Sequence, residues 1–229
     1  MATLFPYARP DHLPLPHCRK TRRRRFFSAL DPKRDGLGVF VANGDGTNPK
    51  ELTTGKLDGF AACTPDGKAV LYPDADNILQ KVSTESGPSQ KAFDFPVFSR
   101  ITVSPDGKLA AFVTLKGNDP KEKLAVISLD SSQPARFLEF DRPRAEFQFG
   151  YTIGSVAFSA DGKSIVYPTR NRETDNLWLQ NLDGSPGKQL PDFKTEFIRD
   201  FDYSFDGEQL AIIRDHRDAD VVRLRDSEK

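Results

Sequence analysis

The sequence has few of the residues that form disulfide frameworks and metal sites. Its 229 residues include two cysteines, three histidines, one methionine and one tryptophan. The spacing of Cys18 and Cys63 is not typical of a metal site, and we interpret Cys63, in an apolar segment, as a small buried hydrophobic residue. This content excludes a disulfide-rich scaffold and does not define the redox compartment.

Long hydrophobic runs are also missing. No apolar run approaches the roughly 18 residues that a membrane-spanning helix needs, so the sequence predicts no membrane segment. The stretch TRRRRFFSAL (21–30) has arginines before two phenylalanines, as a twin-arginine export signal does, but DPKRDG follows in place of an apolar region. We therefore reject an export signal, and the localisation stays unassigned.

Motifs of known catalytic chemistry are missing as well. The sequence has no G-x-S-x-G nucleophile elbow, no P-loop and no dinucleotide-binding fingerprint. His12 and His17 lie near the N-terminus, and His216 lies in the charged stretch RDHRDAD, where we interpret it as a surface residue. We expect no catalytic, cofactor-binding or metal-binding residues, and we predict that the protein is not an enzyme.

Positive charge is concentrated at the N-terminus, although the whole chain is neutral. The chain has 33 basic and 33 acidic residues, whereas residues 1–36 hold nine Lys or Arg and three Asp, a net charge of +6. Because this region is rich in Pro and Arg and has no periodicity, we predict a disordered arm without strands. Nucleic-acid binding by Arg22–Arg25 is the alternative; it would be sensitive to salt and would vanish when residues 1–36 are deleted.

The most informative feature is a repeated sequence motif. VSPDGKLAAFVT (103–114) is matched by CTPDGKAVLY (63–72), FSADGKSIVYPT (158–169) and YSFDGEQLAIIR (203–214). The turn glycines Gly67, Gly107, Gly162 and Gly207 are 40, 55 and 45 residues apart. Repeats of roughly 40–45 residues with four strands each are typical of propeller blades. The sequence therefore predicts an all-β fold, a β-propeller of four-stranded blades over residues 37–229.

Each repeat divides into strands in the same way. Complete blades are expected at 59–95, 100–140 and 154–193. Two strands from Leu37 onward precede them, and three strands follow, at 198–204, 208–215 and 220–226. A second repeat supports this division, because VFVANGDGTNPKELTTG (39–55) aligns with LWLQNLDGSPGKQLPDF (177–193). The NGDG of the first segment is not a calcium loop of the EF-hand type, since threonines stand where acidic ligands are needed.

The Asp-Gly pair of each repeat has a mechanical role. A tight hairpin needs a residue with positive φ, which glycine adopts freely, while aspartate hydrogen-bonds neighbouring backbone amides. Pro65 and Pro105 preset φ one step earlier in the turn. The turn residues predicted on this basis are Asp66, Gly67, Asp106, Gly107, Asp161, Gly162, Asp206 and Gly207. We interpret the four aspartates as structural, because the repeat scatters them one to a blade.

These phrases resemble the blades of TolB-like β-propellers, a WD-repeat-like family, over residues 37–226. Residues 174–226 look like the closing blades of propellers at the C-terminus of bacterial, especially acidobacterial, Ser/Thr protein kinases. In those proteins the propeller follows a cytoplasmic kinase domain and a transmembrane helix and is interpreted as a sensor, often periplasmic. The sequence has none of the kinase motifs, so the resemblance does not carry kinase activity over.

The resemblance also implies an incomplete ring. Propellers of this family close with about six or seven blades, whereas the repeats in this sequence supply about four. We expect a partial propeller that results from a truncated gene, a mispredicted start or a frameshift; a compact propeller with a functional basic arm is the alternative. Open strand edges of a partial propeller would favour self-association.

Non-catalytic binding is the function that these observations favour. Propellers expose loops at both ends of a central channel, and function lies in sites on those loops. We expect a partner protein or a small ligand at a propeller face, no cofactor and no nucleic acid, with the chain as a fragment of a kinase sensor domain. The alternative is a propeller enzyme, either a lactonase-like metal hydrolase or a fragment of a peptidase-associated propeller. Tight Ca²⁺ binding that raises the melting temperature would favour the enzyme.

Overall fold

A computed structural model describes residues 24–31, 36–56, 58, 61–85, 87–117, 121–130, 133–139, 156–171, 174–204 and 207–215. In this part of the chain all seventeen regular elements are β-strands, and they form five sheets. The predicted all-β class is confirmed. The described residues contain no helix long and apolar enough to cross a membrane.

Three sheets have four strands each, paired antiparallel in chain order. The first contains β4 (Ala62–Cys63), β5 (Ala69–Pro73), β6 (Ile78–Ser83) and β7 (Gln90–Pro96). The second contains β8 (Thr102–Val103), β9 (Leu109–Leu115), β10 (Glu122–Ser128) and β11 (Arg136–Glu139). The third contains β12 (Ala157–Phe158), β13 (Ser164–Asn171), β14 (Thr174–Asn181) and β15 (Lys188–Gln189). These sheets match the three complete blades that the sequence predicts, except that β7 extends one residue further, to Pro96.

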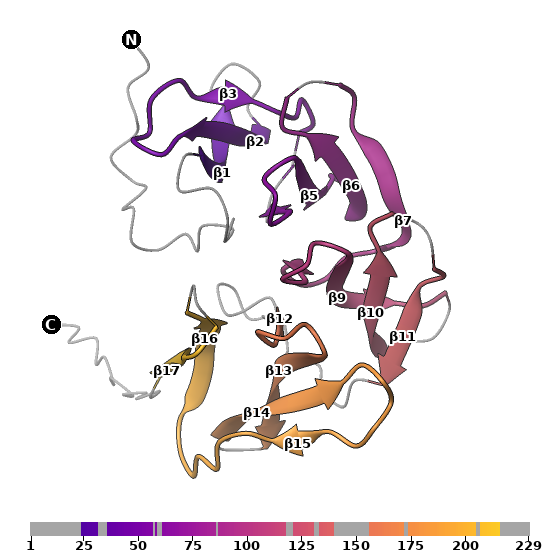
Figure 1. Cartoon of the computed structure of the whole chain (residues 1–229), viewed down its shortest axis with the longest axis vertical. Helices are drawn as coiled ribbons and strands as arrows, with labels where there is room; N and C mark the ends of the chain where they lie inside the picture. The colour runs from indigo at the N-terminus through magenta and orange to yellow at the C-terminus, as the bar shows by residue number, and fades with distance from the viewer. Residues whose placement is uncertain are drawn as a thin grey trace, which may run out of the picture.

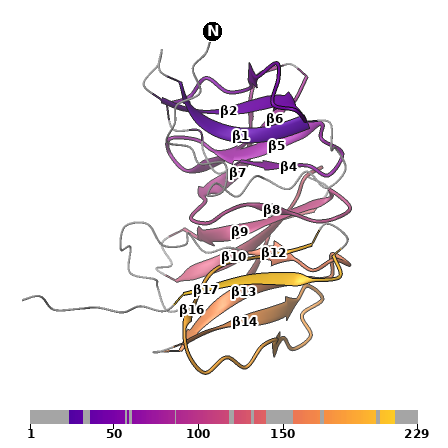
Figure 2. The same cartoon turned by 90° about the vertical axis from the view of Figure 1, so that its left-hand side faces the viewer.

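The five sheets are arranged around a common centre and follow one another in chain order (Figure 1; Figure 2 gives the side view). The short first strands lie on the inner side, where β8 contacts both β4 and β12. Later strands of each sheet lie progressively farther out, so that β7, β11 and β15 form the rim. This is the arrangement of propeller blades, and the predicted β-propeller of four-stranded blades is confirmed.

The hydrophobic core is divided among the interfaces between successive sheets. In β9, Ala110 and Phe112 pack toward the sheet before it, whereas Ala111 and Val113 pack toward the sheet after it. All four side chains are at most 3% exposed. A strand that is buried on both faces needs a continuous apolar run, which is why the LAAFV segment does not alternate with polar residues. The repeat is thus a stack in which each sheet covers its neighbours.

The first sheet corrects one prediction. It contains β1 (Arg24–Asp31), β2 (Gly36–Asn43) and β3 (Lys50–Glu51), whereas the sequence predicts no strand before Leu37. β1 pairs with β2 along its whole length, and Phe26 lies opposite Val41 and is 1% exposed in the core shared with the next sheet. The interpretation of residues 1–36 as an arm without strands is therefore wrong for 24–31. Residues 1–23 lie outside the described residues.

The last sheet contains two described strands, β16 (Phe197–Tyr203) and β17 (Leu210–Asp215). Its core-facing residues Ile198 and Phe201 are buried against the sheet of β12–β15. The register between the two strands shifts by one residue between Ile198 and Asp200, which is a β-bulge. The strand predicted at 220–226 and His216 lie outside the described residues.

Candidate functional site

Each Asp-Gly turn is built from the same set of hydrogen bonds. In the first complete sheet, the Thr64 hydroxyl donates to Asp66 Oδ1 over 2.6 Å, and the Lys68 backbone amide donates to the same oxygen over 3.0 Å. Gly67 has φ of 70°, which glycine adopts without steric cost, and its amide donates to the Thr64 carbonyl. The aspartate therefore closes its own hairpin.

The next two turns repeat this geometry. Ser104 and Ser159 take the place of Thr64, and their hydroxyls donate over 2.6 Å to Asp106 and Asp161. In the fourth turn Asp206 lies outside the described residues, while Gly207 has φ of 77° and donates to the Ser204 carbonyl. The described turns are spread over successive sheets, one to a sheet.

The charge of these aspartates is stabilised by their turns. The hydroxyl of Ser104, followed by the amide of Lys108, holds the pKa of Asp106 below its ordinary value. The same two causes lower the pKa of Asp66 and of Asp161. These carboxylates are therefore negatively charged across the neutral range, and each has Oδ1 committed to the turn.

Successive turns also contact one another, which the sequence did not indicate. A Cβ atom added to Gly107 would lie 3.3 Å from Cδ of Pro65, in the turn of the preceding sheet. A Cβ atom on Gly162 would lie 3.4 Å from Cδ of Pro105 in the same way. The prolines that the sequence suggested only as φ restraints thus pack on the glycine of the following turn. The three described turns with these contacts form a row at one face of the propeller.

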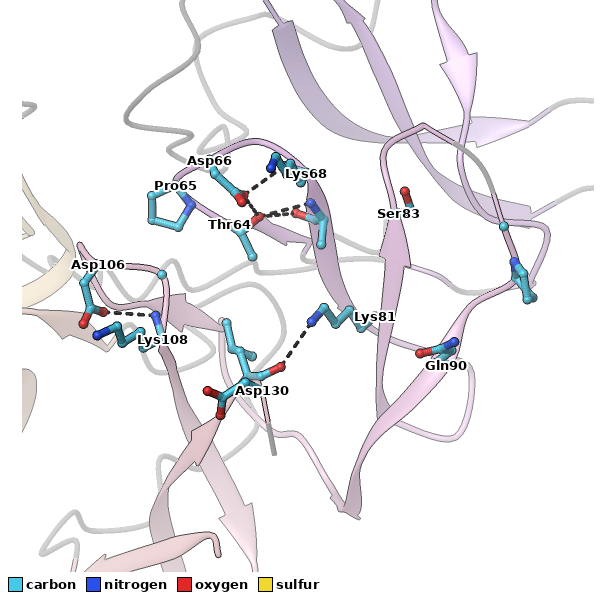
Figure 3. Close-up of a pocket in the computed structure, with 15 residues that line it drawn as sticks. Thr64, Pro65, Asp66, Lys68, Lys81, Ser83, Gln90, Asp106, Lys108 and Asp130 are labelled. Atoms are coloured by element: carbon cyan, nitrogen blue, oxygen red, sulfur yellow. Dashed lines mark hydrogen bonds between the residues drawn. The ribbon is translucent and has the colours of Figure 1, made fainter. Parts of the chain in front are cut away.

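A pocket of about 570 Å³ opens beside this row of turns, between the sheet of β4–β7 and the sheet of β8–β11 (Figure 3). Two consecutive Asp-Gly turns form one side of it, and the loop from β6 to β7 and the turn after β10 form the other. Its charged lining residues are Asp66, Lys68, Lys81, Asp106, Lys108 and Asp130. The volume is within the range of about 300–1,000 Å³ that is usual for ligand sites. The pocket carries equal numbers of positive and negative side chains.

Lys81 crosses this pocket from one sheet to the next. It lies in β6, and its ammonium group donates to the Leu129 carbonyl of the neighbouring sheet over 3.2 Å (Figure 3). Ser83 and Gln90 lie on the Lys81 side, and Asp106 and Lys108 lie on the other. The sequence pattern indicates no role for Lys81, because the repeat is defined by its turns and not by its outer strands.

The described residues contain no group of three or more His, Cys, Asp or Glu side chains placed to hold a metal ion. Cys63 is buried in β4 beside Val70 and Tyr72. The pocket therefore supplies ammonium groups, carboxylates, hydroxyls and backbone groups, which are groups that recognise a polar ligand by hydrogen bonds and charge.

No family model and no curated protein matches the sequence, whereas solved structures match the fold. TolB from Acinetobacter baumannii is 20% identical, with a TM-score of 0.67, and the match covers 85% of this chain and 47% of that one. A chain of a nidogen/laminin complex is 13% identical, with a TM-score of 0.56 and coverage of 84% and 70%. A prolyl endopeptidase is 15% identical, with a TM-score of 0.56 and coverage of 79% and 30%. The chain thus has a TolB-like propeller fold and spans about half the length of TolB.

Proposed function

We propose that this propeller is a non-catalytic module that binds a partner protein at the face formed by the Asp-Gly turns. The observation that carries the proposal is the polar pocket between two adjacent sheets, which is lined by two of these turns. The aspartates of the turns are held in fixed positions by their own hydrogen bonds, so this face presents a preorganised surface.

The similar structures include both a complex of two proteins and enzymes. One of them is a complex between two proteins, nidogen and laminin, and another is TolB. The prolyl endopeptidase match covers only 30% of that enzyme's chain. The lining of the pocket includes no histidine or cysteine, and Asp66 and Asp106 each have one carboxylate oxygen committed to the hydrogen bonds of their own turns. These observations support the binding module over the alternative of a propeller enzyme.

The finer proposal is that the module belongs to the sensor region of a receptor-type Ser/Thr kinase. It rests on the resemblance of residues 174–226 alone. Sequencing the genomic DNA upstream of Met1 and mapping the 5′ end of the transcript tests it. An upstream frame that encodes a kinase domain and a membrane helix would support the proposal, and a promoter with no such frame would refute it.

A pocket-filling substitution tests the binding function. Peptides would be selected from a random phage-displayed library on the wild-type protein, and their Kd values measured by fluorescence anisotropy. Ser83→Trp places an indole in the pocket, and we expect it to raise Kd by about tenfold or more. Asn181→Trp is the matched control, because Ser83 and Asn181 both pair with the first residue of the second strand of their sheets.

The control should leave Kd unchanged, because Asn181 lies in another sheet, away from the pocket. Selection that yields no peptide, or peptides that bind Ser83→Trp as tightly as the wild type, would contradict binding at this face. Far-UV circular dichroism of each variant checks that the sheets are intact.

A further inference from the structure

The residue pairs between the third and fourth strands follow one pattern of residue type, from which the sheet of β4–β7 departs. The segment of β2 and β3 aligns with that of β14 and β15, so β2 and β3 correspond to the third and fourth strands of a complete blade. In three of the sheets where both strands are described, an apolar residue of the third strand lies opposite a cation of the fourth strand: Val41 and Lys50, Val126 and Arg136, Leu179 and Lys188. In the sheet of β4–β7 the corresponding pair is Lys81 and Gln90, so the cation is in the third strand. A repeat that departs from its own pattern at one position marks that position as a candidate for function.

The exchange moves a positive charge toward the inside of the molecule. Lys50 and Arg136 are exposed rim residues, and they donate to carbonyl groups of the next sheet, those of Glu85 and Leu182, over 2.6 and 2.8 Å. Lys81 makes the same kind of bond, to the Leu129 carbonyl, but from one strand closer to the centre, where it is half-buried. The rim position is left to the neutral Gln90, and the pocket lies between these two residues and the turns.

Lys81 keeps hydrogen-bonding capacity in this position. An ammonium group has three N–H donors. Among the described residues, Lys81 donates one hydrogen bond, to the Leu129 carbonyl. No ion pair joins Lys81 to a carboxylate in the described part of the chain, although Asp66, Asp106 and Asp130 line the same pocket. A half-buried charge without a charged partner is a favourable place for an anionic ligand group.

The remaining lining selects the kind of anion. Asp66 and Asp106 are negatively charged, and their Oδ1 atoms are committed to the turns, which leaves each a second oxygen that can accept hydrogen bonds from a ligand. Three carboxylates in the lining disfavour a ligand with several negative charges, such as a phosphate group. A single carboxylate on a chain of amide N–H donors matches both the ammonium group and the free carboxylate oxygens.

We propose that Lys81 anchors a carboxylate of an extended peptide segment that enters the pocket between β7 and the two Asp-Gly turns. The peptide carboxylate accepts charge-assisted hydrogen bonds from the Lys81 ammonium, and backbone amides of the peptide donate to Asp66 and Asp106. This inference rests on the proposed binding function and specifies its ligand class.

Blocked tripeptides test the anchor directly. N-acetyl-Gly-Asp-Gly-amide offers a side-chain carboxylate, N-acetyl-Gly-Gly-Gly with a free C-terminus offers a terminal one, and N-acetyl-Gly-Asn-Gly-amide is the neutral control. Chemical-shift titration of the backbone amides of Gly107 and Lys108 gives each Kd. We expect the Kd of one of the two carboxylate peptides to be about tenfold or more below that of the neutral peptide. Inorganic phosphate should bind more weakly than this carboxylate peptide.

A double substitution that recreates the residue pair of the other sheets tests the role of Lys81. Lys81→Val combined with Gln90→Lys keeps the net charge and recreates the pair seen in the other sheets, and we expect it to weaken carboxylate binding about tenfold or more. Gln90→Lys alone keeps Lys81 and should retain binding. Lys81→Gln, which is polar and of similar length, gives the same test if the double variant does not fold.

The outcomes separate this inference from the proposed function. If the library-selected peptides lose affinity for Ser83→Trp but bind the Lys81 variants as tightly as the wild type, the binding function stands and the carboxylate anchor is refuted. Equal binding of the Asp and Asn peptides, or tighter binding of phosphate than of both carboxylate peptides, overturns the anchor as well.

Discussion

The inner and outer halves of the sheets differ in how closely they follow the repeat. The inner halves hold the first and second strands and the Asp-Gly turns, and the described turns share one set of hydrogen bonds. The outer halves hold the third and fourth strands, where β7 has seven residues and β15 has two. The Lys81 and Gln90 exchange and a register shift in the pairing of β6 with β7 also lie there. The fold is specified near the centre, which leaves the outer strands able to change and acquire a site.

The largest expected effect is the loss of an inner core side chain. Phe112 of β9 is fully buried between two sheets, so Phe112→Ala should lower the free energy of unfolding by about 3–5 kcal/mol. Phe137 of β11 is a partly buried rim residue, and Phe137→Ala should cost about 1 kcal/mol. Urea denaturation of both variants gives the two values. Equal losses would show that the rim contributes as much stability as the centre.

The second effect separates the inner turns from the outer ones. Gly107 has φ of 75° and would bring a Cβ atom to 3.3 Å from Pro65, whereas Gly46, in the turn from β2 to β3, has φ of 85° with open space around it. The strain of positive φ should lower the free energy of unfolding by about 1 kcal/mol in both alanine variants. In Gly107→Ala the contact with Pro65 should add to this loss. Thermal unfolding compares them, and an equal loss would argue against the packing of successive turns.

The smallest effect is a difference in pH dependence. The turn lowers the pKa of Asp106, so its contribution to stability is present above the unfolded pKa of about 3.9 and is lost as the pH falls through the folded pKa. Ser104→Ala removes the largest cause of this shift. The stability difference between wild type and variant should therefore be greatest at neutral pH and narrow on acidification.

An outer turn provides the control for this measurement. The Thr47 hydroxyl donates to Asp45 over 2.7 Å and lowers its pKa in the same direction, in the exposed turn from β2 to β3. Thr47→Ala should change the acid dependence less than Ser104→Ala, because solvent screens the exposed turn. Urea midpoints measured from pH 7 down to pH 3 test both variants. If the midpoints of wild type and Ser104→Ala differ by the same amount at every pH, the prediction is contradicted.

Most of the fold follows from the sequence because the Asp-Gly turns fix where each hairpin begins. The three complete sheets lie in the predicted segments, since Gly67, Gly107 and Gly162 each mark a turn with positive φ. β1 is the exception. Arg24 and Arg25 conceal the alternation that buries Phe26, and the partner strand that covers it is not visible in the local sequence.

The pocket is less predictable than the fold for a different reason. The exchange of Lys81 and Gln90 appears only when the register of β6 with β7 is known, and that register shifts between Ile78 and Gln80. The contact of Pro65 with Gly107 likewise depends on how far one sheet is rotated from the next. Local patterns determine the turns, whereas these features depend on the geometry between strands and between sheets.

The division of the core among the sheet interfaces has a consequence for how the molecule opens. Each of the four clusters of buried side chains joins one sheet to the next, and none spans three sheets. Stability is therefore a series of nearest-neighbour couplings, as in other repeat proteins. The end sheets have one such interface among the described residues, so their amides should exchange with solvent before those of β9 and β10. Cooperativity in this protein extends along the chain of sheets and weakens toward its two ends.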